Sequence, residues 1–518
     1  MKRVHFAHVI VGARVLTRRP AAQPGAQGVQ AKARTLSHRN LAAAPRSKAK
    51  GPSQSCCSLA LAKTREKPEQ EGTLMFERFA FARPLAAATL SLALAAGTGA
   101  SPAFADPAPK DVLKIHADIA QAAYGDSLDT AHTLKLAVDA FLTEHTEDNL
   151  RGARAAWIAA RIPYMQTEAF RFGNAIVDDW EGRVNSWPLD EGLIDYVSSS
   201  YGTESAENDL YTANVIANKT LIIGGKKLDT SKITKELLAD HLQEAGGVEA
   251  NVATGYHAIE FLLWGQDLNG TGPGNGNRPA SDYDVKKCTN GNCERRAEYL
   301  RAATDLLVDD LAWMAAQWAP GGEARKHIMD GSDEAGLTAI MTGLGSLSYG
   351  ELAGERMKLG LMIHDPEEEH DCFSDNTHAS HFFDALGIRN VYLGSYRRAD
   401  RSLVTGPSIS DLVKAKSPEV DAEVRAKLDA TMEAMNALYL RALTIESYDQ
   451  MIGEDNDAGN AVVQHAIDAL LDQTKSLERA VAALDLKSIK FEGSDSLDAP
   501  DKVQQESKAA SDGGGEQH

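Results

Sequence analysis

Aromatic residues are scarce in this 518-residue chain, at 6%, and so are cysteines, of which there are five. No stretch alternates apolar and polar residues over the length of a strand, which argues against an extended β-sheet. Abundant Ala and Leu favour helices instead. No apolar run after residue 105 is long enough to cross a bilayer as a helix. We therefore predict an all-α protein without a transmembrane helix in its mature part.

Basic residues are outnumbered by acidic ones, and the imbalance is uneven along the chain. The formal net charge is -19. Residues 1–105 hold 16 Lys or Arg and four Asp or Glu, so the remainder has 38 basic and 69 acidic residues, a net of -31. Such a surface repels nucleic acid and anionic lipid head groups and attracts cations. We expect no nucleic-acid partner.

The basic N-terminus contains a secretion signal that does not begin at residue 1. From Met75 the chain has a positive n-region, an apolar h-region over residues 85–96, and an Ala-Phe-Ala cleavage site that ends at Ala105. We predict a signal peptide over residues 75–105 and export to the periplasm or cell envelope, with outer-membrane association left open. Residues 1–74 lack helical periodicity and are interpreted as a non-native upstream extension, with a long targeting segment as the alternative.

The mature chain divides at a stretch rich in Gly, Pro and Asn. No Gly-Lys-Ser/Thr follows its glycines, so we interpret residues 269–294 as a linker and not as a phosphate loop. Helical segments are expected on both sides, over residues 106–268 and 295–490. The polar, Gly- and Ser-rich residues 491–518 are predicted to be a disordered tail.

Two cysteines of the linker flank a turn. Cys288 and Cys293 enclose the turn dipeptide Asn290-Gly291, which folds the chain back on itself. In an oxidising compartment we predict a disulfide between them. A metal clip is the alternative, although the two cysteines supply only two ligands. Cys372 is left unpaired.

One expected helix carries an inward carboxylate. It runs from a cap at Thr146 to about Phe172, and Pro163 is expected to kink it. An apolar stripe at helical spacing extends to Glu168 and Arg171, so both charges are expected on the core side. The stripe consists of Leu150, Ala153, Trp157, Ala160 and Tyr164. An internal ion pair is the alternative to a ligand role for Glu168.

The segment GYHAIEFLLW places a histidine and a carboxylate on one face. His257 and Glu260 are three residues apart, which on a helix puts them one turn apart. Apolar residues surround them, so this helix is expected to be buried. A buried, ionised carboxylate needs a positive partner or a proton. Both side chains can ligate one divalent metal. A core histidine beside an ion-paired Glu260 is the alternative.

A third segment adds two more acids. Over residues 344–362, Glu351 and Glu355 lie four apart on a stripe with apolar ends, and at least one is expected to point inward. Arg356 is a competing cation. The segment that follows, residues 364–381, contains four histidines. It could bind a metal loosely, but we interpret it as a solvated turn.

These segments resemble a known family. GYHAIEFLLWGQD is similar to the G-x-H-x-x-E signature of imelysin-like proteins, also called peptidase family M75, with Gly255, His257 and Glu260 at the signature positions. The resemblance spans about residues 106–486. WIAARIPYMQTEAFRFG and SYGELAGERMKLGLMIHDPEEEHDCFSDNTH look most like the iron-regulated branch of the family. The family resemblance implies a fold of two packed helical bundles with internal pseudo-symmetry.

The resemblance and the inward acids together predict the function. We expect a periplasmic protein that binds iron or another divalent metal and serves iron uptake or homeostasis, alongside other envelope iron-uptake components. The predicted metal ligands are His257 and Glu260, with Glu168, Glu351 and Glu355 from the stripe argument alone.

Two other functions stay open. One is a zinc-type metallopeptidase, in which His257 and Glu260 bind the metal and another Glu is the base, or Glu260 itself is catalytic. Catalytic zinc needs three protein ligands, and the sequence contains neither H-E-x-x-H nor G-x-S-x-G. The second is a non-catalytic binding module for a small ligand or a protein.

Overall fold

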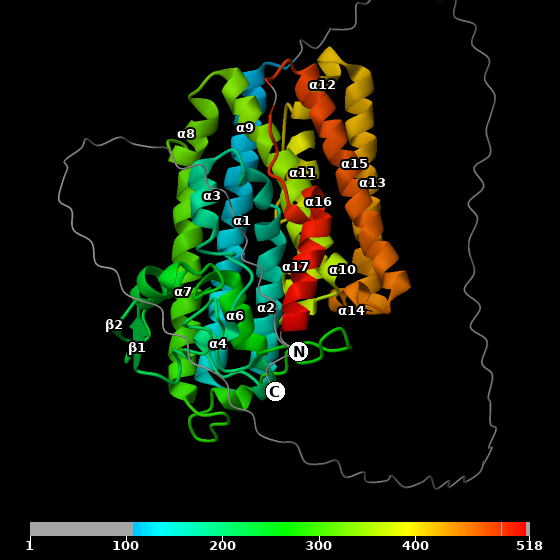
Figure 1. The fold of residues 1–518 in the computed structure, drawn as a ribbon. Helices are drawn as coiled ribbons and strands as arrows, with labels where there is room; N and C mark the ends of the chain where they lie inside the picture. The colour runs from blue at the N-terminus through cyan, green and yellow to red at the C-terminus, as the bar shows by residue number, and fades with distance from the viewer. Residues whose placement is uncertain (1–106, 488, 514–518) are drawn as a thin grey trace, which may run out of the picture. The chain divides into compact units, whose positions relative to one another are not determined.

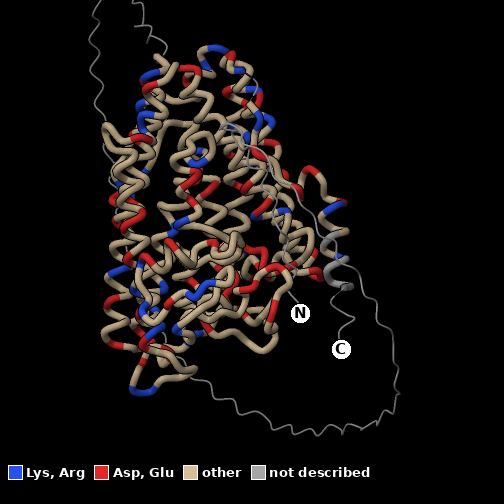
Figure 2. Tube along the Cα trace, turned by 60° about the vertical axis from the view of Figure 1, so that its left-hand side comes forward, with Lys and Arg blue, Asp and Glu red and all other residues tan. Residues whose placement is uncertain are grey.

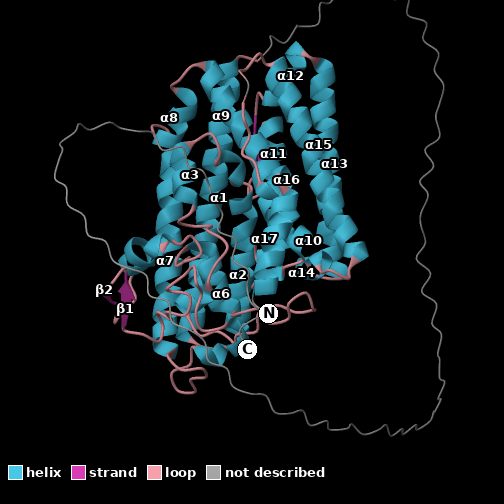
Figure 3. Ribbon diagram, viewed as in Figure 1, coloured by secondary structure: helices cyan, strands magenta, loops and turns pink. Residues whose placement is uncertain are grey.

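Helices dominate the part of the chain that the structure describes. The structure is a computed structural model and describes residues 107–487 and 489–513. The all-α fold class predicted from the sequence is confirmed (Figure 3). The predicted upstream extension at 1–74 and signal peptide at 75–105 lie outside the described residues.

Three long helices form one group, seen on the left of Figure 1. Helix α1 (Pro109–Thr143) packs along both α2 (Glu147–Met165) and α7 (Cys293–Trp318), and the short α6 (Gly255–Trp264) lies against α2 and α7. The predicted start of α2 is confirmed, because the Thr146 hydroxyl accepts a hydrogen bond from the third residue of the helix. The predicted stripe from Leu150 to Tyr164 is buried.

A second group lies on the right of Figure 1. Helix α13 (Pro418–Thr444) packs along α15 (Asp457–Ala483) and against α11 (Thr377–Leu393). Helix α11 also packs against α2, which joins the second group to the first.

One long helical run connects the two groups and changes its winding midway. Helix α9 (Asp333–Ser346) continues into a π-helical segment, Leu347–Lys358, and then into α10 (Leu359–Ile363). In a π-helix the hydrogen bonds run from i to i+5 and the residues per turn increase. Side chains five apart are therefore brought onto one face, which matters for Glu351 and Arg356.

The remaining elements are short. The strands pair as two antiparallel hairpins, β1 (Thr220–Ile223) with β2 (Lys226–Asp229) and β3 (Ser395–Arg397) with β4 (Leu403–Thr405). The other helices are α3 (Ala175–Glu181), α4 (Glu191–Ile194), α5 (Lys235–Leu237), α8 (Glu323–Met329), α12 (Ile409–Lys416), α14 (Tyr448–Ile452), α16 (Asp495–Asp498) and α17 (Pro500–Gly513).

The C-terminal residues differ from the predicted disordered tail. Residues 489–513 pack on the long helical run and form α16 and α17. Glycines in the run make room for them: a Cβ on Gly345 would lie 2.1 Å from the Phe491 ring. The Ser496 hydroxyl donates to the Gly354 carbonyl at 3.0 Å. Composition alone hides this contact, because few apolar residues of the tail, among them Phe491, make it, and the rest is backbone and small residues.

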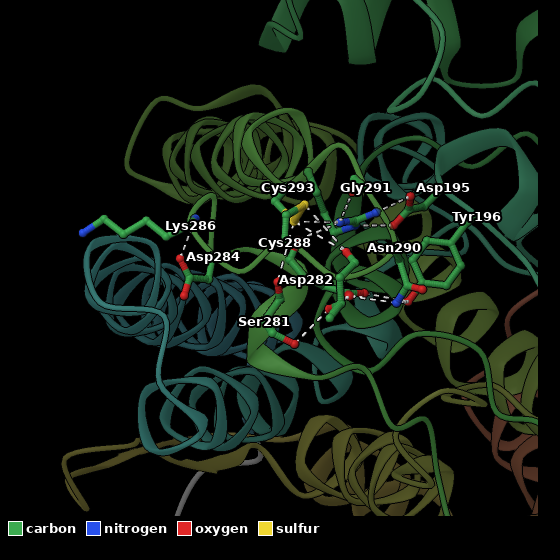
Figure 4. Close-up of a disulfide and its surroundings, with 12 residues drawn as sticks. Asp195, Tyr196, Ser281, Asp282, Asp284, Lys286, Cys288, Asn290, Gly291 and Cys293 are labelled. Carbon is green, nitrogen blue, oxygen red and sulfur yellow. Dashed lines mark hydrogen bonds and ion pairs between the residues drawn. A yellow bond between two sulfur atoms is a disulfide. The ribbon is translucent and has the colours of Figure 1, made fainter.

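The predicted turn in the linker is closed by the predicted disulfide. Cys288 and Cys293 are bonded, and Asn290 and Gly291 between them both have positive φ (Figure 4). Cys293 is also the first residue of α7, which packs on α1 and so stands with the first group of helices. Cys372 is a free thiol.

The turn supports a buried ion-pair network at the start of α7. The Arg296 guanidinium donates to both oxygens of Asp195, at 2.6 and 3.0 Å. It also donates to the carbonyls of Asp282 and Gly291, at 2.6 and 2.9 Å. The disulfide therefore stabilises the backbone that faces this guanidinium.

Acidic and basic positions are interspersed along the described trace (Figure 2). No helix among residues 107–487 and 489–513 combines the length and the apolar character needed to span a bilayer.

Candidate metal centre

The centre is built on α6, which is buried along its whole length. Its first residue, Gly255, has φ +79°, and a Cβ there would lie 2.4 Å from the Val184 carbonyl oxygen. Only glycine permits this conformation and this close approach without strain. The Tyr256 amide donates to the same carbonyl at 2.7 Å. The chain at Val184 therefore fixes where α6 begins and how His257 and Glu260 are presented.

His257 and Glu260 contact each other directly, as their spacing predicted. The His257 Nδ1 atom lies 3.0 Å from Glu260 Oε2, and both residues are buried. The other oxygen of Glu260 accepts from the amide and hydroxyl of Ser374, at 3.0 and 2.7 Å. Burial raises the pKa of Glu260 well above its usual value, and the nearby Asp371 raises it further. Burial lowers the pKa of His257 to about 3, so this imidazole is neutral at physiological pH.

Two residues of the loop before α11 complete the cluster. His257, His370 and Asp371 each bring one ligand atom within 4.8 Å of the others, and no other such trio occurs in the described part of the chain. The Asp371 Oδ1 atom is 3.5 Å from His370 Nδ1 and 4.0 Å from His257 Nδ1. Its Oδ2 atom accepts from Asn376 and Ser380, at 2.8 and 2.5 Å. The carboxylate is therefore held in one orientation toward the two rings.

A buried guanidinium already faces this cluster. Arg161 of α2 donates to Asp371 Oδ1 at 2.8 Å and lies 3.3 Å from His370 Nδ1. Its positive charge contributes to the lowered pKa values of His257 and His370, after burial. It holds the pKa of Asp371 below its usual value against the effect of burial. Any metal ion in the centre shares the Asp371 carboxylate with this guanidinium.

The donor set nevertheless fits a metal ion. The His257 Nε2 atom is buried without a hydrogen-bond partner, while the Nδ1 atom of the same ring contacts Glu260. A ligating histidine characteristically bonds a carboxylate through its other nitrogen, which orients the ring. Two imidazoles and one carboxylate form a donor set used for both non-haem iron and zinc.

The stripe carboxylates lie in a different network, centred on Arg356. This guanidinium contacts Glu168 at 2.6 Å, Glu351 at 2.7 Å and Asp384 at 2.9 Å. Arg171 adds a second cation 3.3 Å from Glu351. Glu168 therefore forms an internal ion pair, which was the alternative to a ligand role.

The π-helical segment explains the pairing of Glu351. The Arg356 Nε atom donates to Glu351 Oε1 at 2.9 Å, across five residues of one helix. In an α-helix Glu351 would face position 355, as the sequence predicted, whereas the wider π-turn turns it to position 356. Glu355 itself is half-buried on this segment and is not part of the His257 trio.

His370 and Asp371 were missed because the loop was interpreted as a solvated turn. That interpretation is wrong for residues 368–371, which are all buried. The helix that follows starts at Thr377 after Asn376. The loop has no helical or strand periodicity, and its run of charges resembles a solvated surface. The one useful signal was its density of histidines and acids.

Comparison with known proteins identifies the family of this chain. The sequence profile of the imelysin family, Peptidase_M75, matches residues 120–477. The chain belongs to the imelysin family. A curated relative, iron-regulated protein A of Synechococcus elongatus, is 39% identical over 64 residues, which cover 12% of this chain and 18% of the relative. The matched part is thus less than a fifth of that relative's length.

A solved structure of a similar protein supports the fold. A protein of Parabacteroides distasonis, assigned as an iron-regulated protein A precursor, aligns with a TM-score of 0.51 at 19% identity and covers 74% of this chain and 97% of its own. An imelysin-like protein of Psychrobacter arcticum aligns with a TM-score of 0.48 at 16% identity, covering 74% and 99%. At such identity the first match shows the imelysin fold alone.

Proposed function

We propose that this imelysin-family protein binds a divalent metal ion, iron in the first place, in the periplasm and serves iron uptake or homeostasis. The observation that carries the proposal is the buried trio of His257, His370 and Asp371. The iron assignment draws on the names of the relatives, iron-regulated protein A and its precursor. The excess of acidic residues after residue 105 is consistent with a cation as ligand.

Each residue of the centre has a definite part in this proposal. His257 and His370 offer imidazole nitrogens and Asp371 offers a carboxylate oxygen. The Glu260 carboxyl group lies 3.0 Å from Nδ1 of His257 and orients the imidazole ring. Glu260 is thus a positioning residue rather than the direct ligand predicted from the sequence. The positive charge of Arg161 compensates the negative charge of Asp371 in this centre.

Metal analysis of the mature protein tests the proposal. The protein expressed from Asp106 is dialysed against a chelator, reloaded with Fe²⁺ or Zn²⁺, and its metal content measured. We expect about one ion per chain in the parent and its loss in His257→Ala and Asp371→Asn. The control is His132→Ala, which removes an exposed imidazole on α1. Unchanged metal content in His257→Ala would refute the assigned centre.

The alternative in which Glu260 is catalytic requires this residue to act as a general base. A general base must reach the attacking water, but both Glu260 oxygens already have partners, in His257 and Ser374. The structure thus favours binding over hydrolysis. Peptidase activity that disappears in Glu260→Gln while the metal stays bound would favour the enzyme.

A further inference from the structure

A cavity of about 430 Å³ lies between α2, α11 and the β3–β4 hairpin. No residue of the candidate metal centre lines it. Its wall comes from three segments that are far apart in the sequence. The apolar side chains of this wall are Ile162 and Pro163 of α2, Phe383 and Leu386 of α11, and Leu403 of β4.

Apolar side chains around this cavity are exposed to solvent. Ile162 is 37% exposed and Leu403 is 52% exposed. Ile158, one turn before Ile162 on the same face of α2, is also 37% exposed. Single exposed apolar residues are ordinary, whereas several that adjoin one cavity mark a binding site. The cavity is therefore an apolar surface that no part of the described chain covers.

The polar groups of the inner wall are already bonded within the protein. Gln166 and Tyr396 line the cavity and are both buried. The Gln166 side chain accepts from the Asn390 amide and donates to the Ile162 carbonyl, both at 3.0 Å. The Tyr396 hydroxyl donates to Asp126 at 3.0 Å. A ligand therefore needs no polar atom at the inner end of the cavity.

The rim of the cavity is positively charged. Two arginines line it and no acid does. Arg398 is held by Asp126, to which its Nε and Nη2 atoms donate at 3.0 and 2.6 Å. Arg397 is exposed, and its Nη1 atom donates to the Arg401 carbonyl at 3.3 Å. Among the described residues Arg397 forms no ion pair, so its charge can attract an anion even though acids outnumber bases in this chain.

We propose that this cavity binds a small amphipathic anion, a single short hydrocarbon chain that ends in a carboxylate. The hydrocarbon lies against Ile162, Phe383 and Leu403, and the carboxylate meets Arg397 at the rim. A guanidinium binds a carboxylate through a forked pair of hydrogen bonds, which gives the ligand one orientation.

The size of the cavity limits the ligand to one chain. Small-molecule pockets have volumes of about 300–1,000 Å³, and this cavity, at about 430 Å³, lies near the lower end of that range. It therefore suits one short chain and not a whole lipid with two. The site goes beyond the proposed function, because it requires no metal at His257.

Calorimetric titration of the mature protein with sodium decanoate, below the concentration at which decanoate forms micelles, tests the site. We expect one decanoate to bind per chain. Decyltrimethylammonium has the same hydrocarbon chain and a positive head group. It should bind about tenfold more weakly, because the positive rim attracts an anion and repels a cation.

Two variants with matched controls locate the site. Arg397→Gln should weaken decanoate binding about two- to fivefold, in the range of an exposed ion pair. Its control is Arg151→Gln, which removes an exposed arginine near the start of α2. Ile162→Asn should weaken binding at least about fivefold, because the apolar wall is lost. Its control is Ile158→Asn, which changes an equally exposed side chain outside the lining and should bind as the parent does.

None of the four substituted side chains is buried, so each variant is expected to fold, which circular dichroism verifies. A parent that binds no decanoate, or that binds the cation as tightly, would overturn the site. Arg397→Gln and Ile162→Asn variants that bind decanoate as the parent does would also overturn it. Binding of phosphatidylglycerol vesicles without binding of free decanoate would show a membrane-docking face in its place.

Discussion

Replacing Arg356 by methionine tests whether the stripe carboxylates are neutralised by the protein itself. The substitution keeps much of the side-chain volume and removes the guanidinium. It leaves Glu168 and Asp384, which are 2% and 0% exposed, without the cation that contacts them at 2.6 and 2.9 Å. Glu351 retains Arg171 at 3.3 Å, so the damage is concentrated on the two buried acids.

The expected cost follows from the burial of these two acids. Breaking a buried ion pair by removing one partner costs about 3–5 kcal/mol, because the other charge stays buried. Two acids lose their partner here, so we expect the free energy of unfolding to fall by at least about 3 kcal/mol at pH 7.5. The matched control is Arg389→Met on α11. Its ion pair with Asp429 is exposed to solvent, so its loss should cost about 0–1 kcal/mol.

The destabilisation caused by Arg356→Met should increase with pH. Burial raises the pKa of Asp384 well above its usual value, and Arg356 opposes this rise. Without Arg356 the folded-state pKa rises further above the unfolded value, so folding takes up a proton and stability decreases as pH rises through the folded pKa. The difference between parent and variant should therefore be smaller at pH 5 than at pH 7.5.

Urea denaturation followed by circular dichroism, at both pH values and with or without Fe²⁺ or Zn²⁺, provides the measurement. A loss below about 1 kcal/mol at pH 7.5, within the range of an exposed ion pair, would show that the buried network does not need its guanidinium. A gain in stability on adding metal that is larger in Arg356→Met than in the parent, and that persists when His257 is also replaced by Ala, would show that Glu168 and Glu351 are metal ligands, as the sequence predicted, and would refute the ion-pair account.

Three further outcomes are expected from the same protein. Gly255→Ala should cost at least about 1–2 kcal/mol, because a side chain is strained at positive φ and the new Cβ would meet the Val184 carbonyl; unchanged urea denaturation would contradict the fixed start of α6. Removing metal with a chelator should lower the thermal midpoint of the parent and leave that of His257→Ala unchanged, since only a ligand bound to the folded state stabilises it; equal shifts would place the metal elsewhere. Replacing Cys288 and Cys293 by serine should lower stability by up to about 3 kcal/mol, because the closed loop is short, with native helix content; loss of the helical signal would show that the disulfide determines the fold.

Local patterns were enough to predict helix α6 and the start of α2, whereas α2 ends at Met165 and not near Phe172 as predicted. The Thr146 cap, the buried stripe on α2, the burial of α6 and the pairing of Cys288 with Cys293 all depend on residues close together in the chain. Helical spacing alone brings His257 to Glu260. Such features need no knowledge of the tertiary fold.

The rest of the site depends on contacts that no local pattern contains. Asp371 meets Arg161 across 210 positions of the chain, from a loop without periodicity. Glu351 faces Arg356 because the helix unwinds into a π-segment, and the α-helical spacing assumed for the sequence predicts a different face. The first requires long-range packing and the second a departure from the commonest helix geometry.

Burial of the proposed metal centre has a consequence for the rate of metal exchange. His257, Glu260, His370 and Asp371 are each at most 1% exposed, so an ion cannot enter or leave without a local opening of the protein. The loop that carries His370 and Asp371 lacks regular helix over most of its length, whereas α6 is enclosed on all sides. Segments with few regular hydrogen bonds open most readily. If the proposed centre binds an ion, its uptake and release would be set by the rate at which this loop opens, which would favour retention of the ion over rapid exchange with the surroundings.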